Sequence, residues 1–390
     1  MRLLVTLEHH FVRCSEGVFT DLSFSYDYWQ EYLALFDEVI VAARVKNCAD
    51  RPEGLMRADG RGVRFFDISD FRGVLSFLKK APRVFWQTGK AVRTIDRYLL
   101  RTGIISILVW IWLQLLGKPQ YAFECGGHVR EGITTDRPKT ILYKSIALIA
   151  HVVCKAQVRF AICASYTSNF LRNCYPCRNR QSEFVFSGVR LTEDIVTSPR
   201  DEQFFRNRPF RFLSVGRLEP QKGHLVMINA AATLINEKEL PEWELEIVGP
   251  GSQVEKLRGY IKEIGISDRV RLVGGVKWGD HLFSYVDRSH LFVLPSLTEG
   301  MPRSLIEGMA RGIPAIGSRT GGIPELLQEE DLFPPGDVLG MANKMAERMK
   351  APVRLVSMSE NNFKRALEFR IEFTKAKKTD FWRCIVNSSV

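Results

Sequence analysis

The chain has 390 residues, which is enough for two domains of nearly 200 residues each. Its 45% hydrophobic and 25% charged content is typical of a soluble globular protein and excludes a chain that is disordered over long stretches. A net charge of +11 and a pI near 9.3 favour anionic partners, which are nucleic acid, phosphorylated metabolites or an anionic membrane surface.

The N-terminus shows no export signal. The first ten residues, MRLLVTLEHH, are a short apolar run followed by Glu8, His9 and His10, which predicts a first buried strand. We therefore expect a cytoplasmic protein with reduced thiols. Cys174 and Cys177 form a CxxC pair, but no second such pair completes a four-cysteine zinc site, so no metal site is expected.

Strand-like and helix-like stretches alternate through the first half. The apolar run within residues 102–117 has about 15 residues, fewer than the roughly 20 that a membrane-spanning helix needs, so a buried helix is expected there. Continuous apolar strands separated by helices predict a parallel sheet covered on both faces. The predicted strands are 2–7, 38–45, 62–68, 119–127, 158–165 and 183–189.

The alternation stops in a polar stretch with Pro199 and Pro209 and then restarts. Later strands are predicted at 210–218, 243–251, 269–276, 290–296 and 313–318, and the last residues read as one long, basic, amphipathic helix over 361–386. The predicted units are an N-terminal domain (1–190), a linker (191–209), a C-terminal domain (210–361) and a helical segment (362–390) that packs back on the N-terminal domain. Both domains are expected to be doubly wound α/β folds, whose ligands lie at the carboxyl ends of the strands.

The first candidate site is the loop GRLEPQKG, residues 216–223, which follows a predicted strand. Arg217 and Lys222 are five positions apart between glycines, so both can reach one anion such as a diphosphate. The alternative is a solvated turn with two surface cations.

The second candidate is EGMPRSLIEGMARG, residues 299–312, at the end of another predicted strand. Glu299 can accept hydrogen bonds from sugar hydroxyls, and the amides that begin the next helix favour a phosphate. Ser304 and Glu307 also fit a capping box, which is the structural alternative for Glu307. A third loop, Arg319 to Glu325, contains paired glycines that allow close approach of a ligand or satisfy a turn.

These loops resemble the glycosyltransferase family 4 group of GT-B enzymes, with the E-x7-E signature, over roughly residues 210–330. The resemblance rests on SVGRLEPQKG and on LPSLTEGMPRSLIEGMARGIPAIGSRTGGIPEL. It implies a GT-B fold, in which two Rossmann-like domains face each other across a cleft. The N-terminal domain would be on the acceptor side, and the C-terminal domain would bind the nucleotide sugar.

The resemblance also implies roles for residues of the C-terminal domain. Arg217 and Lys222 would hold the donor diphosphate and stabilise it as the leaving group, Glu307 would bind the ribose and Glu299 the transferred sugar. The remaining donor-binding residues would be Gly300 and Met301, through their backbone, Ser304, and Val276 in the loop 274–278 beside the nucleobase.

In the N-terminal domain the family places a glycine loop after the first strand and a polar residue, often His, after a later strand. The matching candidates are Gly17, as a donor-binding residue, and His128, as a catalytic residue. The sequence departs from the family here because the first loop, EHHFVRCSEG, lacks paired glycines. His9 or His10 could then project into the site, and His128 has a structural alternative.

The resemblance predicts transfer with retention at the anomeric carbon. The chain has no D-x-D motif, and fixed Arg and Lys side chains can neutralise the leaving diphosphate, so no metal and no cofactor are expected. The partners would be a nucleotide sugar and a glycan or lipid-linked acceptor, in polysaccharide or glycolipid biosynthesis. Cations mixed with aromatics at 78–86, with Arg93, Arg97 and Arg101, fit an anionic membrane, which would place the protein peripherally on its inner face; a solvated basic face is the alternative.

Other classes of protein remain open from the sequence. A sugar-nucleotide epimerase shares the GT-B fold but would release a changed nucleotide sugar without any acceptor. A dinucleotide dehydrogenase would need G-x-G-x-x-G after the first strand, where the chain has none. A nucleic-acid-binding protein would use the positive charge, but with the three strand-end loops no nucleic-acid partner is expected.

Overall fold

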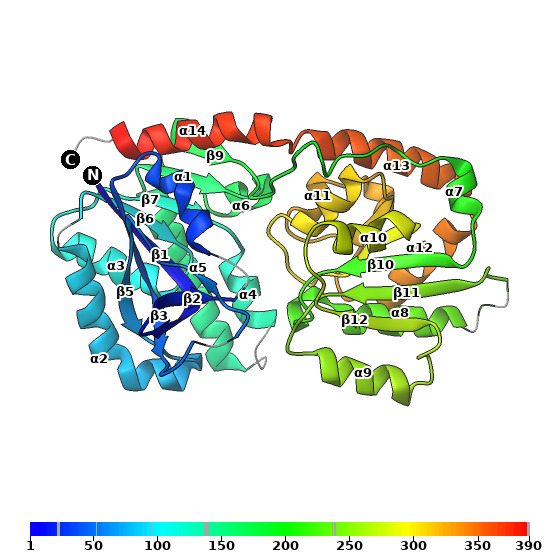
Figure 1. The fold of residues 1–390 in the computed structure, drawn as a ribbon, viewed down its shortest axis with the longest axis horizontal. Coiled ribbons are helices and arrows are strands. Elements are labelled where there is room, and N and C mark those ends of the chain that lie inside the picture. The colour runs from blue at the N-terminus through cyan, green and yellow to red at the C-terminus, as the bar shows by residue number, and fades with distance from the viewer. Residues whose placement is uncertain are drawn as a thin grey trace.

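The computed structural model describes residues 1–21, 24–51, 53–93, 95–135, 140–235, 237 and 239–387. Two α/β domains lie next to each other, each built on its own sheet (Figure 1). The last residues of the chain return to the N-terminal domain, so the N-terminus and the end of the last helix lie close together in the view.

The N-terminal sheet has a parallel central part. Its strands lie in the spatial order β5 (Val63–Ser69), β3 (Glu38–Asn47), β1 (Arg2–Cys14), β6 (Arg97–Arg101), β7 (Ala122–Cys125), β8 (Cys163–Tyr166) and β9 (Glu183–Val185). Successive strands are added on one side of β1 (β3, β5) and then on its other side (β6 to β9), which is a doubly wound arrangement.

The loop predicted after the first strand, EHHFVRCSEG, is wrong for residues 8–14, which form a strand. β1 continues through residues 8–14 and turns into an antiparallel hairpin with β2 (Gly17–Thr20), which pairs with β4 (Met56–Arg57). The polar residues of EHHFVRC made this strand difficult to recognise. His9 and Phe11 lie on the same side of β1 with their rings 4.9 Å apart, and Phe11 is buried.

Helices cover both faces of the N-terminal sheet. One face carries α2 (Gly73–Val92), α3 (Ile104–Leu115), α5 (Ile141–Arg159) and α6 (Asn169–Cys174). The other face carries α1 (Gln30–Leu33) and α14 (Ile371–Asn387). The apolar run near residue 110 is α3, whose Ile105, Val109 and Leu113 are fully buried. Among the described residues, α5 alone has the length and apolar composition to cross a membrane, yet its Ala147, Cys154 and Val158 belong to the core.

The C-terminal sheet is parallel throughout. Its strands lie in the order β12 (Val270–Gly274), β11 (Trp243–Val248), β10 (Phe210–Val215), β13 (Leu291–Leu294), β14 (Ala315–Ser318) and β15 (Leu332–Phe333). One face packs against α8 (His224–Ile235), α9 (Val254–Glu263) and α12 (Val338–Met349). The other face packs against α10 (Asp280–Arg288) and α11 (Arg303–Ala310).

The segment predicted as the linker is not a free connection. It contains α7 (Glu202–Arg206), whose Phe205 is fully buried in the C-terminal core, and Leu191 and Ile195 are buried against the same domain. A cap supports α7, because the Asp201 carboxylate accepts a hydrogen bond from the Phe204 amide at 2.8 Å. Leu191, Ile195 and α7 of the predicted linker therefore pack as part of the C-terminal domain.

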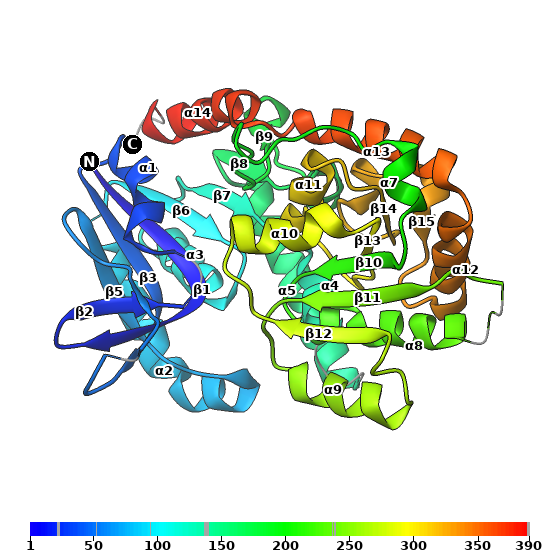
Figure 2. The same ribbon diagram turned by 45° about the vertical axis from the view of Figure 1, so that its right-hand side comes forward.

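The single long helix predicted over 361–386 is two helices. α13 (Pro352–Leu367) packs on the C-terminal domain. The helix is interrupted at residues 368–370, and the Ile371 amide then donates to the Leu191 carbonyl at 3.1 Å. Beyond the break, Phe381, Trp382 and Ile385 of α14 are buried in the N-terminal domain, and Figure 2 shows α14 lying over it. Residues 388–390 of the predicted segment lie outside the described residues.

Candidate active site

Three loops meet at the carboxyl edge of the C-terminal sheet. They follow the neighbouring strands β10, β13 and β14, whose parallel course brings their ends to one edge. Gly223 has φ +68°, and a methyl group added there would lie 2.0 Å from the Pro295 carbonyl oxygen. The Gly322 amide donates to the Gly300 carbonyl at 2.7 Å. The three loops are therefore packed backbone against backbone.

Lys222 and Glu299 form an ion pair at this edge. Lys222 ends a short 3₁₀ helix, η3 (Pro220–Lys222), and its Nζ lies 2.7 Å from Glu299 Oε2 and 2.9 Å from Oε1. The Ser296 hydroxyl donates to Glu299 Oε2 at 2.9 Å. Only 10% of the Glu299 side chain is exposed. The carboxylate is thus held in one orientation by a cation and a hydroxyl from two different loops.

Arg217 points into solvent beside this pair. It is 60% exposed, and its nearest acid, Glu219, is 3.9 Å away and accepts hydrogen bonds from the amide and hydroxyl of Ser252. Across the domain boundary, burial lowers the pKa of His9, and the charge of Arg217 contributes to the lowering. Arg217 is therefore a solvent-exposed cation on the same loop as Lys222, close enough to the N-terminal domain for its charge to act on His9.

The predicted capping box is wrong. α11 begins at Arg303 with Pro302 as its N-cap, so Ser304 already lies inside the first turn. The Ser304 hydroxyl donates instead to the Val215 carbonyl at 2.9 Å, which fixes α11 against the end of β10. Glu307 therefore has no capping partner in Ser304, and the structural alternative for it is lost.

Glu307 lies on the second turn of α11 beneath the loop of residues 274–278. Trp278 Nε1 donates to its Oε1 at 3.4 Å. Burial raises the pKa of Glu307, although the Trp278 hydrogen bond and Arg303 oppose the shift. Val276, from the same loop, packs against the core beside α11. A partly buried carboxylate that accepts a hydrogen bond from a half-exposed indole suits a ligand that brings hydroxyl donors and a flat base.

The N-terminal domain faces these loops with α4 (Val129–Thr135), which begins directly after β7 and His128. The Glu131 amide donates to His128 Nδ1 at 3.3 Å, so a neutral His128 carries its proton on Nε2. Burial lowers the pKa of His128, and the nearby Glu131 charge opposes this. The His128 ring forms a cluster with those of His151 and Tyr175, whose centroids are 5.3 and 5.6 Å from it and 5.1 Å from each other.

Hydrogen bonds join the two domains through Thr298, Glu131 and Glu325, of which the sequence had pointed only to Glu325, at the end of the third candidate loop. The Thr298 hydroxyl donates to Glu131 Oε2 at 2.9 Å. The Glu325 carboxylate accepts from the Asn169 amide at 3.0 Å and from the Phe170 amide at 2.7 Å, so it caps α6 of the other domain. Glu131 could have been suspected from the sequence, because it follows His128 by three positions on a helix. The contact of Glu325 could not, because its partner Phe170 lies 155 residues away in the chain.

The structure does not place Gly17 with the other predicted donor-binding residues. It turns the β1–β2 hairpin, and a methyl group added there would meet the Asp59 carboxylate at 2.7 Å and Arg57 at 3.3 Å. Met301, in contrast, lies in the loop after β13 with its Cε against Gly322. The structure thus gathers Arg217, Lys222, Glu299, Gly300 and Met301 at one edge, and Ser304, Glu307 and Val276 lie around α11.

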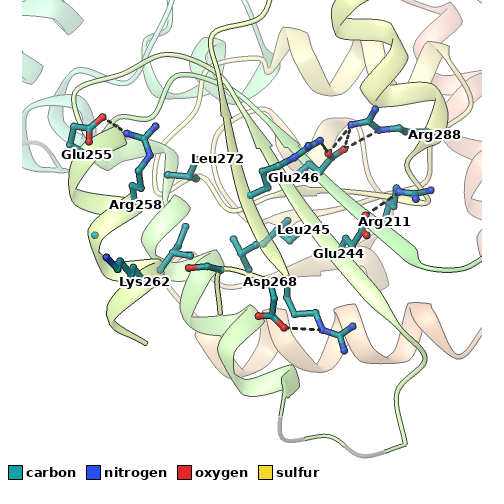
Figure 3. Close-up of a pocket in the computed structure, with 16 residues that line it drawn as sticks. Arg211, Glu244, Leu245, Glu246, Glu255, Arg258, Lys262, Asp268, Leu272 and Arg288 are labelled. Atoms are coloured by element: carbon teal, nitrogen blue, oxygen red, sulfur yellow. Dashed lines mark hydrogen bonds and ion pairs between the residues drawn. The ribbon is translucent and has the colours of Figure 1, made fainter. Parts of the chain in front are cut away.

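A separate pocket of about 840 Å³ lies elsewhere on the C-terminal domain, around α9 and the starts of β10, β11 and β12 (Figure 3). Arg288 and Arg271 there are bonded to the buried carboxylate of Glu246, and Arg211 pairs with Glu244. Because the pocket is lined by the amino-terminal halves of these strands, it is not part of the site at their carboxyl ends.

Two α/β domains with the candidate loops at a sheet edge between them form a GT-B fold, and this predicted fold is confirmed by solved structures. The Anabaena protein Alr3699/HepE in complex with UDP-glucose has a TM-score of 0.63 at 16% identity, over 97% of this chain and 99% of that one.

A family model for glycosyl transferases group 1 matches residues 197–365. The protein is a glycosyltransferase. Protein CapJ of Staphylococcus aureus is 27% identical over 325 residues, 82% of this chain and 79% of CapJ. The Escherichia coli UDP-Gal:alpha-D-GlcNAc-diphosphoundecaprenol alpha-1,3-galactosyltransferase is 34% identical over 126 residues, which is 32% of this chain and 32% of that protein.

Proposed function

We propose that the protein transfers a sugar from a nucleotide sugar to a glycan or lipid-linked acceptor, with retention and without a metal, in cell-surface polysaccharide or glycolipid biosynthesis at the inner face of the membrane. The observation that carries the proposal is the strand-end arrangement of Lys222, Glu299 and Arg217. Two cations and an oriented carboxylate there match a donor with a diphosphate beside a sugar.

On the donor side, Lys222 and Arg217 bind the diphosphate oxygens and stabilise the charge that develops as the glycosidic bond breaks. An ammonium has three donors, so Lys222 can keep its bond to Glu299 while it binds phosphate. Glu299 accepts hydrogen bonds from sugar hydroxyls, and the backbone of Gly300 and Met301, at the start of α11, contacts the sugar phosphate. Glu307 binds the ribose diol.

On the acceptor side, neutral His128 donates from Nε2 to the sugar undergoing transfer. The acceptor hydroxyl attacks from the face that the leaving group departs, and its proton passes to the departing phosphate. Placing the two cations in fixed loops lowers the barrier because they need little reorganisation as charge develops. The acceptor class is supported by the E. coli galactosyltransferase, which is named for a diphosphoundecaprenol-linked GlcNAc acceptor. UDP-glucose in the HepE structure supports the donor class.

The test is thermal-shift screening of the purified chain against UDP-, GDP-, ADP- and TDP-sugars, each with and without EDTA. We expect one nucleotide to raise the melting temperature equally in both conditions. If none of them stabilises the protein, the assignment of the donor site is wrong. If EDTA abolishes the shift, the metal-independent part of the proposal is wrong.

A further inference from the structure

The helix layer of α2, α3 and α5 leaves an apolar outer surface uncovered. On α5, the side chains of Ile141, Leu142, Ile149 and Val152 are 85, 63, 63 and 56% exposed. On α2, Leu75 is 78% exposed. These helices cover one face of the same sheet, and α3 packs against both α2 and α5, so their outer sides point away from the molecule in one direction.

The charges of this layer all have one sign. The chain has 44 acidic residues in 390, yet none falls within α2, α3 or α5. The outer side of α2 carries Lys79, Arg83 and Lys90, and Lys90 Nζ lies 3.4 Å from the centre of the exposed Trp86 ring. On α5, Lys144 and Lys155 are exposed. Exposed apolar side chains beside cations, with acids excluded, match the interface of an anionic lipid bilayer.

The basic face predicted from the sequence is therefore only partly right. Arg101 is 11% exposed and is bonded to Glu124 at 2.8 Å on the neighbouring strand. Arg97 donates to the Ile385 carbonyl at 3.0 Å, under α14 on the opposite side of the sheet. Neither arginine can meet a bilayer together with α2. The cations that remain available lie on α2 and α5.

α5 also reaches the site from its inner side. The His151 ring lies 5.3 Å from that of His128, and His151 Nδ1 is 2.9 Å from the Tyr175 hydroxyl. α4, which carries Glu131, packs along α5. The apolar outer surface of α5 is thus separated from His128 by the diameter of one helix, roughly 10 Å.

We propose that the outer surface of α5 and α2 lies flat on an anionic bilayer and that this contact presents a lipid-linked acceptor to His128. α5 lies in the interface and does not cross the membrane, because its inner side belongs to the protein core. The acceptor half of this inference rests on the proposed function, whereas the bilayer contact does not require it.

The experiment is cosedimentation of the full chain with vesicles of phosphatidylglycerol and phosphatidylcholine, without donor or acceptor. Leu148→Glu combined with Val152→Glu should lower partitioning at least about tenfold, since two apolar side chains lose burial. The matched control is Leu339→Glu with Val353→Glu, which changes two similarly exposed side chains on α12 and α13 and should leave binding unchanged. Lys144→Gln with Lys155→Gln should lower binding to anionic vesicles and not to pure phosphatidylcholine.

Several results would overturn the proposal. Equal partitioning of wild type and the α5 double variant means that another surface binds lipid. A dimer of the wild type in analytical ultracentrifugation that the α5 variant abolishes means that a second copy of the chain covers this face. If the chain binds vesicles but no nucleotide sugar stabilises it, the proposed function fails while the bilayer contact stands. Unchanged transfer by the α5 variant to a vesicle-embedded acceptor refutes the presenting role.

Discussion

Replacing Glu307 with Gln should weaken donor binding without lowering the stability of the fold. The substitution keeps the shape of the side chain and removes its charge, so hydrogen bonds to a ribose diol lose their ionic component. Bonds to a charged group contribute about 1.5–3 kcal/mol, which predicts a donor Kd about ten to one hundredfold higher. Because Ser304 and Glu307 form no capping box, the unfolding free energy should not fall; loss of a true cap would cost about 1 kcal/mol.

The pH dependence of the same variant tests the burial of Glu307. Its pKa is raised in the folded protein, so the native state holds the proton more tightly than the unfolded chain does. Stability of the wild type relative to Glu307→Gln should therefore decrease as pH rises from the ordinary glutamate pKa, about 4.3, through the raised pKa, and level off above it. Donor affinity of the wild type should rise over the same window, because the ionised carboxylate binds the diol.

Isothermal titration with the stabilising nucleotide sugar measures Kd, and urea unfolding at several pH values measures stability. Glu263→Gln, at an exposed position on α9, controls for a general charge effect. Glu299→Gln should mainly lower turnover and leave the donor Kd within a few fold. The reasoning is refuted by a Glu307→Gln protein that is less stable yet binds donor as the wild type does.

Three further substitutions probe the loops and the domain contact. Lys222→Met should lower kcat about one hundredfold, since it removes a fixed cation at the leaving group, whereas Lys256→Met on α9 should not; steady-state kinetics decides. Glu325→Gln should weaken the cap on α6 and raise the radius of gyration in X-ray scattering, and an unchanged scattering profile would contradict this. Gly300→Ala should preserve donor Kd but slow transfer, because the added methyl group would lie 2.6 Å from the Gly126 carbonyl oxygen. Gly259→Ala, which meets open space, should leave transfer unchanged.

The candidate site could be predicted from the sequence where its residues are close together in the chain. The loop 216–223 and the stretch 299–312 could be recognised because each follows an apolar strand directly, and parallel strands bring such loops to one edge. The bond between Lys222 and Glu299 joins residues 77 apart, so spacing in the chain contained no sign of it. The capping box failed because the N-cap is set by where Pro302 lets α11 begin, two residues before Ser304.

The N-terminal half was harder for a physical reason. In residues 8–14 polar side chains lie within a strand, so hydropathy alone predicts a loop. Arg101 looked like a surface cation because its partner, Glu124, is opposite it on a neighbouring strand and distant in the chain. Partners across a sheet decide whether a charged residue is buried, and pairing of this kind cannot be read from one segment.

Residues 298–300 connect the two halves of the site. Thr298 donates to Glu131, Glu299 binds Lys222, and Gly300 lies against the Gly126 carbonyl, so three consecutive residues contact the acceptor side, the donor cation and the domain boundary. A donor that repositions Glu299 must therefore also move the contacts to Glu131 and Gly126. Glu131 fixes the tautomer of His128 through its amide, and it lies on the helix that packs along α5. In the proposed function, residues 298–300 therefore link the donor cation Lys222 to the helix that orients His128, and separating the two domains would break this link.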